Sequence, residues 1–242
     1  METRKLFKDG SFESRAYITW VPHSHYYHTR WDLYAKGYMD AADCLIDDSI
    51  ANHHAHKGDR LIYPIIFSYR QALELKLKQI LLLDESLKTN ATKDALELMN
   101  DFGHKIDTLW EKVKIIIIQL FKKDIEEHGE GTIQQIDNYI KEFAEIDSES
   151  FTFRYPLAKP NRKQAKEGTL PIEQLENLGD DREPICLSNL KESMHDLMSF
   201  LTGATDTLGN QLETDRKNSL PIPALIELET HEGIRIDSNY KK

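Results

Sequence analysis

A strongly apolar segment with regularly spaced charges, from Tyr63 to Lys78, constrains the fold more than any other part of the chain. Within it Arg70, Glu74 and Lys78 follow one another at steps of four. On an α-helix of about 3.6 residues per turn they form one column, which also passes through Tyr63 and Phe67. Because unpaired buried charge is costly, these side chains need partners. The column is either an ion-pair ladder that fixes helix packing or the polar floor of a site, and the residue types favour the ladder.

Apolar residues also recur at spacings of three and four in other long segments, which predicts further amphipathic helices. Asp59 can cap the helix that contains the column, and Pro64 lies near its first turn, where a missing N–H costs little. The Gly129-Glu130-Gly131 sequence predicts a break between two helices. Together the segments predict an all-α bundle of four to five long helices. The predicted helices cover residues 29–50, 60–83, 104–122, 132–146 and 186–213.

The periodic segments divide the chain into three parts. Residues 1–28 form an irregular arm, residues 29–213 form the helical bundle, and residues 214–242 form a tail. The tail contains two short apolar runs around His231-Glu232-Gly233, so it is either a small β-hairpin or a disordered end, and the pattern favours the hairpin. In the first helix of the bundle, the face expected to be buried contains Trp31, Tyr34, Tyr38, Ala41, Ala42, Leu45 and Ile46.

The overall charge limits the classes of partner. The net charge of −10 argues against a protein that coats nucleic acid, so contact with a polyanion requires a local basic patch. The first ten residues are polar and predict no signal peptide, and the run Ile115–Ile118 is far shorter than the roughly 20 residues of a membrane span. Cys44 and Cys186 are far apart and suit free thiols in a reducing compartment. We therefore expect a cytoplasmic protein without a membrane partner.

Histidines cluster at positions 23–28 and 53–56, but neither cluster has helical spacing or a cysteine partner. Zinc requires three or four converging nitrogen or sulfur ligands, so we expect surface or interface histidines, no metal site and no cofactor. His104 is different because it follows Gly103 at the start of a helix, where anions are favoured. Capping or packing is its simplest role, and contact with a ligand is the other.

A basic stretch follows the sequence Phe153-Arg154-Tyr155-Pro156. An arginine between two aromatic residues suits base stacking and phosphate contact. A solvated loop, with Arg154 paired to a nearby carboxylate, explains the same residues more simply. If RNA binds this chain, the basic stretch is the best candidate for the contact, through Lys159, Arg162, Lys163 and Lys166.

Several of these segments together resemble bacterial HEPN-like proteins, with the similarity running in consistent order from about residue 30 to residue 213. The resemblance implies an α-helical bundle that pairs as a homodimer, of a class found in toxin–antitoxin and anti-phage systems. Many relatives are metal-independent ribonucleases with an Arg followed after four to six residues by His. Here Arg70 is followed by Leu75, Lys76 and Leu77, so the nuclease pair cannot be carried over. The segments are residues 34–43, 63–64, 69–78, 103–105, 109–110 and 153–156.

Two hypotheses about function follow. The first is a dimeric binding or regulatory module whose polar cleft receives a nucleotide, RNA or a cognate protein partner. The second is a metal-independent ribonuclease with a non-standard site, in which His104 is the general base and Arg70 or Arg154 stabilises the phosphate. The missing Arg–His motif favours the first. The candidate catalytic residues are Arg70, Glu74 and His104, and the candidate ligand-binding residues are Arg70, Glu74, Lys78, His104 and Arg154.

Overall fold

The computed structural model describes Ala16 and residues 27–52, 56–89, 102–147, 153–154 and 184–219. In these ranges the chain forms helices and their connections and contains no strand. The predicted hairpin of the tail and the basic stretch with Lys159, Arg162, Lys163 and Lys166 lie outside the described residues. So do His23, His25, His53 and His54.

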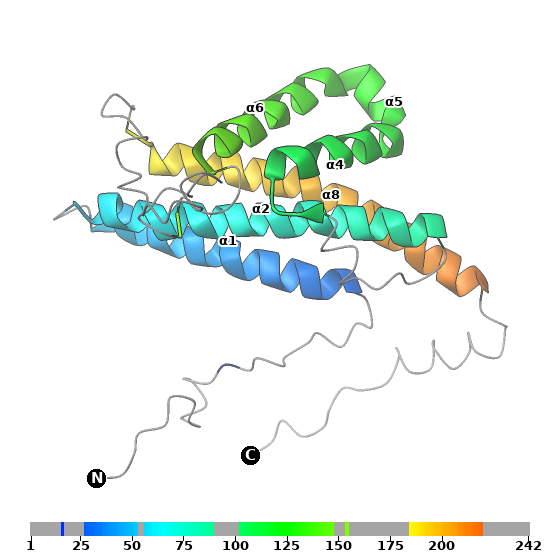
Figure 1. Cartoon of the computed structure of the whole chain (residues 1–242), viewed down its shortest axis with the longest axis horizontal. Helices are drawn as coiled ribbons and strands as arrows, with labels where there is room; N and C mark the ends of the chain where they lie inside the picture. Colours follow the sequence, from blue (N-terminus) through cyan, green and yellow to red (C-terminus); the bar gives the residue numbers. More distant parts are fainter. Residues whose placement is uncertain are drawn as a thin grey trace, which may run out of the picture.

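The prediction of an all-α bundle is confirmed (Figure 1). Helix α8 continues to Ser219, past residue 213, where the bundle was predicted to end. Among the helices of the described residues, none is long and apolar enough to cross a membrane. The helices are α1 (Tyr27–Ala51), α2 (Lys57–Thr89), α4 (Ile106–Leu120), α5 (Lys122–Asp124), the π-helix η3 (Ile125–Gly129), α6 (Glu130–Asp147) and α8 (Leu187–Ser219).

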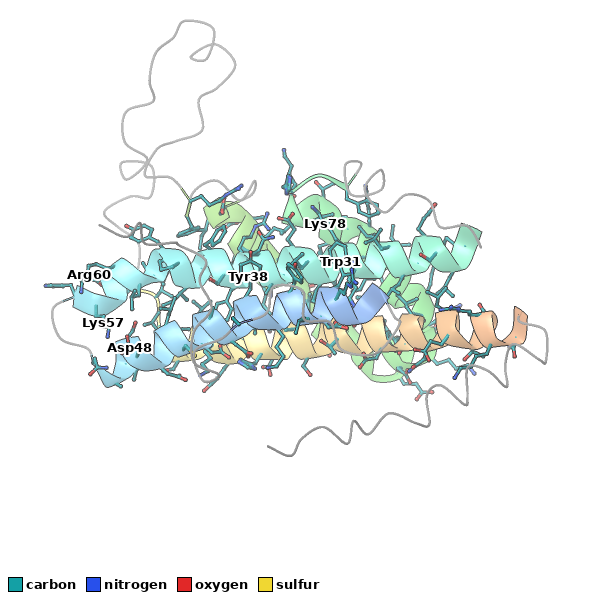
Figure 2. The ribbon with its side chains drawn as sticks, turned by 90° about the horizontal axis from the view of Figure 1, so that it is seen from below. Trp31, Tyr38, Asp48, Lys57, Arg60 and Lys78 are labelled. Carbon is teal, nitrogen blue, oxygen red and sulfur yellow. The ribbon has the colours of Figure 1, made fainter. Side chains whose placement is uncertain are left out.

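Helix α2 is the centre of the bundle. It packs against α1, α8 and α4, while α6 packs against α4 and α8 (Figure 1). The long helices α1, α2 and α8 run side by side, and α4 and α6 lie across them as an antiparallel pair. Leu73 and Leu77 of α2, Trp110 of α4 and Leu201 of α8 are among the side chains that fill the core between these layers. Because both layers meet α2, the charged residues in its middle are buried, whereas Arg60 near its start is exposed (Figure 2).

The buried face of α1 differs from the predicted one. Ala35, Met39, Ala42 and Ile46 face the core, while Tyr34, predicted to be inside, is 61% exposed. Two of the four core residues are alanines, whose small side chains let α1 approach α2 closely. The sequence pattern placed the larger aromatic residues inward because size and spacing alone do not reveal which face meets the partner helix.

The prediction of a break at Gly129-Glu130-Gly131 is wrong. The chain leaves α4 at Phe121 and continues through α5 and η3 into α6 without a break at the glycines. In η3, a Cβ built on Gly129 would lie 2.9 Å from Cγ1 of Ile125 and 3.0 Å from its Cβ. Gly129 therefore allows the backbone and the side chain of Ile125 to approach closely within the π-helix, and it does not form a turn. At Gly131, a Cβ would meet no atom within 4 Å.

Replacing each of these glycines by alanine should change stability in opposite directions. Gly131→Ala should stabilise the protein by about 0.5–1 kcal/mol, because alanine loses less backbone entropy in a helix. Gly129→Ala should destabilise it by about 1 kcal/mol, since the clash with Ile125 outweighs that gain. Urea denaturation of the two variants would measure the difference. Equal stabilisation by both would show that η3 relaxes to an ordinary α-helix at no cost.

Candidate functional site

The charged column of α2 lies in the interior, as predicted. The exposed fractions are 0% for Arg70, 3% for Glu74 and 2% for Lys78. Glu74 holds both cations: its Oε2 accepts a hydrogen bond from Arg70 Nη1 at 2.9 Å, and its Oε1 accepts one from Lys78 Nζ at 2.7 Å. Each pair spans four residues, so the helix itself aligns the three side chains. One carboxylate thus bonds to two buried cations.

Arg70 also connects α2 to two other segments through their backbone. Its Nη2 donates to the carbonyl oxygen of His104, just before α4, and its Nε donates to the carbonyl oxygen of Asp147 at 3.4 Å, at the end of α6. Asp147 itself is 2% exposed, and its charge acts on Arg70. The two buried cations, Arg70 and Lys78, are therefore balanced by two buried carboxylates, Glu74 and Asp147. The interior cluster is neutral overall.

Burial and charge shift the pKa values of the cluster in ways that follow from this geometry. Burial disfavours the guanidinium and lowers the pKa of Arg70; Glu74 and Asp147 offset this only in part, and the charge of Arg154 lowers it further. For Glu74, burial raises the pKa, but the hydrogen bond from Lys78 and the charge of Arg70 outweigh it. The pKa of Glu74 therefore lies below its usual value, and the carboxylate is ionised at neutral pH.

His104 covers the cluster from the solvent side. Its Nδ1 lies 2.7 Å from Glu74 Oε1, yet its side chain is 69% exposed. The preceding Gly103 has φ of +66°, the left-handed region that glycine adopts without strain, and this turn leads the chain into α4. The exposed ring of His104 thus contacts a buried carboxylate through Nδ1, and Nε2 takes no part in that contact.

Phe153, which follows α6 in the chain, packs near the start of α2. The ring centroid of Phe153 lies 6.3 Å from that of Tyr63 on α2, in a tilted arrangement. Arg154 is exposed, and its charge acts on Arg70. Of the five predicted ligand-binding residues, the structure therefore joins four in one hydrogen-bonded cluster, namely Arg70, Glu74, Lys78 and His104, while Arg154 acts on Arg70 through its charge. Three of them are buried, and two, His104 and Arg154, are at the surface.

Sequence reasoning missed a third buried cation on α2. Lys76 is 4% exposed, and its Nζ contacts Asp32 Oδ1 of α1 and lies 3.4 Å from Thr205 Oγ1 of α8. A signal was present in the sequence, because Lys76 lies two residues from both Glu74 and Lys78 and must face away from the column. Its contacts link α2 to α1 and α8, so its place between three helices indicates a structural role.

Asp43 forms another side-chain cluster, between α1, α2 and α8. Its Oδ1 accepts a hydrogen bond from the hydroxyl of Tyr69 at 2.6 Å, and its Oδ2 lies 2.8 Å from His195 Nε2. Burial, reinforced by the bond to Asp43, raises the pKa of the Tyr69 hydroxyl far above its usual value. Within the described ranges, no group of three or more His, Cys, Asp or Glu residues is placed to hold a metal ion.

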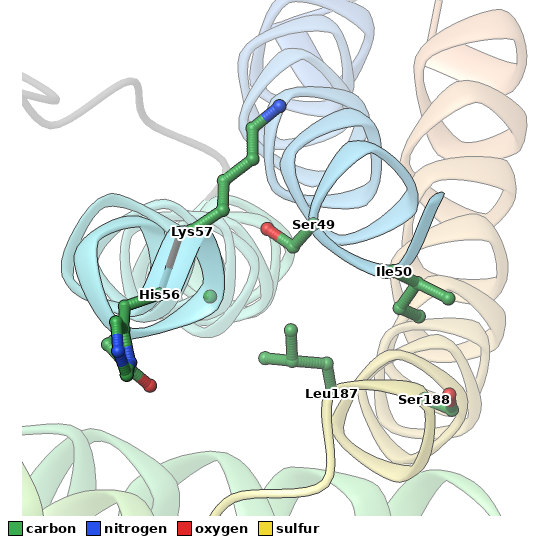
Figure 3. Close-up of a pocket in the computed structure, with 8 residues that line it drawn as sticks. Ser49, Ile50, His56, Lys57, Leu187 and Ser188 are labelled. Atoms are coloured by element: carbon green, nitrogen blue, oxygen red, sulfur yellow. The ribbon is translucent and has the colours of Figure 1, made fainter. Parts of the chain in front are cut away.

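An open pocket of about 640 Å³ lies at the other end of the bundle, away from the column. Figure 3 shows the end of α1, the start of α2 and the start of α8 around it. The charges at its rim are already paired, Lys57 with Asp48 at 2.5 Å and His56 with Asp59 at 2.9 Å. None of the predicted site residues lines this pocket, and its paired charges point to no particular ligand.

Comparison with known proteins leaves the family open. No protein-family model matches the chain, and neither a search of curated proteins nor a search of solved structures finds a match. The HEPN-like resemblance therefore stays a prediction from the sequence segments that carry it.

Glu74→Ala should destabilise the protein strongly. The change leaves the charges of Arg70 and Lys78 in the interior without the carboxylate between them, and such losses cost about 3–5 kcal/mol. The matched control is Glu145→Ala, because the side chain of Glu145 is 62% exposed and its ion pair with Lys141 is long, at 4.0 Å. This change should alter stability by less than about 0.5 kcal/mol. Chemical denaturation measures both. Near-wild-type stability of Glu74→Ala would contradict the ladder interpretation and favour a functional cleft.

The pH dependence of stability offers an independent check on Glu74. Its pKa is lower in the folded protein than in the unfolded chain, where it is about 4.3. Its ionised form therefore stabilises the protein above that value, and the contribution is lost as the pH falls through the folded-state pKa. The free-energy gap between wild type and Glu74→Gln should be constant from about pH 7 to 5 and narrow at lower pH. A gap that widens on acidification would contradict the assignment.

Proposed function

We propose that the chain is a HEPN-like binding module that recognises a phosphate-bearing ligand, a nucleotide or RNA, at His104 and Arg154. One observation carries the proposal: an exposed imidazole lies on the buried cluster, and the charge of an exposed guanidinium, that of Arg154, acts on Arg70 within it. The cluster holds the loop of His104 through its carbonyl bond to Arg70 and through Glu74. An anion would thus meet an imidazole whose position is set by the core.

The start of α4 supports the same proposal. Its N-terminal residue, Ile106, follows Lys105, whose side chain makes no capping hydrogen bond. The positive end of a 15-residue helix therefore lies beside His104. In a chain with a net charge of −10, such a local site would select an anion without attracting polyanions over the whole surface. The HEPN-like resemblance adds the biological setting of the proposal, a cytoplasmic defence or toxin–antitoxin system.

The buried state of Arg70 disfavours the ribonuclease hypothesis in its original form. With an exposed fraction of 0%, Arg70 cannot reach a phosphate unless the core opens, so Arg154 is the remaining candidate for charge stabilisation. One observation keeps a ribonuclease as the second candidate function. A carboxylate on Nδ1 orients an imidazole and favours its action as a general base through Nε2.

A fluorescence titration of labelled single-stranded RNA at several salt concentrations, with competition by a nucleoside triphosphate, tests the proposal. Arg154→Ala and His104→Ala should each weaken binding by about tenfold or more, as expected for loss of a charge-assisted contact. Arg216→Ala is a matched control, because Arg216 is an exposed arginine in the last turn of α8. Equal weakening by Arg216→Ala, or no binding at low salt, would contradict the proposed site.

The same titration decides whether the basic stretch takes part. Changing Lys159, Arg162 and Lys163 together to Gln should lower both affinity and salt dependence if these residues contact phosphates, by roughly 0.7 in slope per lost contact on a single strand. An unchanged slope would leave the stretch as a solvated connection. Cleavage of the labelled RNA that stops in His104→Ala would instead support the ribonuclease.

A further inference from the structure

We infer that binding of a phosphate anion at His104 is coupled to the uptake of one proton on Nε2 of its ring. This linkage rests on the proposed function, because it specifies the proton state in which the proposed site takes its ligand. It begins from the contact between His104 Nδ1 and Glu74 Oε1, at 2.7 Å. The hydrogen-bonding capacity of these two side chains decides what the other ring nitrogen does.

The contact with Glu74 determines which nitrogen of the neutral ring carries the hydrogen. An ionised carboxylate only accepts hydrogen bonds, and a neutral imidazole has one donor nitrogen and one acceptor nitrogen. The carboxylate of Glu74 is ionised, since its pKa lies below the usual value, and its Oε1 also accepts a hydrogen bond from Lys78. Nδ1 of His104 is therefore the donor. In the neutral ring Nε2 is then an acceptor.

An acceptor at Nε2 cannot bind a phosphate oxygen, because the oxygens of a phosphodiester are acceptors too. The ring must first gain a proton on Nε2, after which one nitrogen donates to Glu74 and the other donates to the phosphate. The side chain of His104 is 69% exposed, so both the proton and the anion have access to it. Proton and anion attract each other at this position, and each therefore raises the affinity for the other by the same factor.

The charged groups nearby assign the proton to the imidazole. Lys78 and Arg70 share the carboxylate of Glu74 with the ring. The other charged side chains on the segments that meet here are Lys105 and Asp107 at the start of α4 and Asp147 at the end of α6, and the charge of Arg154 acts on Arg70. Lysine, arginine and carboxylate side chains ordinarily keep their charge between about pH 5 and 8. Among the described residues gathered here, the imidazole is the side-chain type that titrates in this range.

Nitrogen NMR of the histidine rings in the full chain tests the tautomer without any ligand. At about pH 8, above the range in which a histidine ordinarily changes charge, His104 should carry its hydrogen on Nδ1 and none on Nε2. The signals of this ring are identified by their loss in His104→Gln. A hydrogen on Nε2, in a neutral or a charged ring, would overturn the inference whatever the protein binds.

A fluorescence titration between about pH 6 and 8 tests the linkage itself. The probe is a dye-labelled oligouridylate without a terminal phosphate, because its diester groups keep their charge over this range. The dissociation constant of the wild type should rise with pH, towards the limit of about tenfold per pH unit that one proton sets. His104→Gln should bind more weakly, with a dissociation constant that hardly depends on pH.

His195→Gln is the matched control. The ring of His195 also lies on a carboxylate, that of Asp43 at 2.8 Å, and its side chain is 54% exposed. This variant should keep the pH dependence of the wild type, and loss of that dependence here would overturn the inference. So would binding by the wild type that does not vary with pH, or a pH dependence that persists in His104→Gln, although the proposed site would stand in both cases. No binding at any pH would overturn the proposed function and the linkage together, while the tautomer of His104 is measured independently.

Discussion

The buried polar cluster of α2 depends on the hydrogen bonds that the carboxylate of Glu74 accepts. It lies between Arg70 and Lys78 on one helix and also meets the imidazole of His104. Two buried cations without it would be far more costly than the same positions filled with apolar residues. The geometry of α2 makes the arrangement possible, since residues four apart lie one above the other on a single face.

The pairing of Arg70 with Glu74 also determines how separate segments of the chain meet α2. Arg70 is held by Glu74 and has donors left over for the carbonyl groups of His104 and Asp147, which are far apart in the sequence. The start of α4 and the end of α6 are therefore tied to one point on α2. Lys76 performs a comparable task on the other side of α2, towards α1 and α8. The central helix thus uses opposite faces to specify its neighbours, and one of these faces positions the exposed His104.

The sequence predicted the helices well and their faces less well. Periodicity located α1, α2, α4, α6 and α8 because each has an apolar row long enough to stand out. It placed Tyr34 inside because two apolar rows run along α1, and which of them meets α2 depends on the fit between helices. It placed a break at Gly129 because glycine usually marks turns, whereas this glycine relieves a contact with Ile125 inside a π-helix. The local sequence shows neither which row of α1 meets α2 nor that Gly129 lies in a π-helix.

By itself, the sequence determined that α2 carries a charged column that must be paired, since a helix of this spacing aligns Arg70, Glu74 and Lys78 whatever surrounds it. The tertiary structure decided which groups complete the pairing. Asp147 and the backbone of His104 reach Arg70 only after α4 and α6 have folded over α2. It also decided that the column is buried while His104 and Arg154 stay exposed. Burial depends on every element that packs against a residue, and no local pattern contains that information.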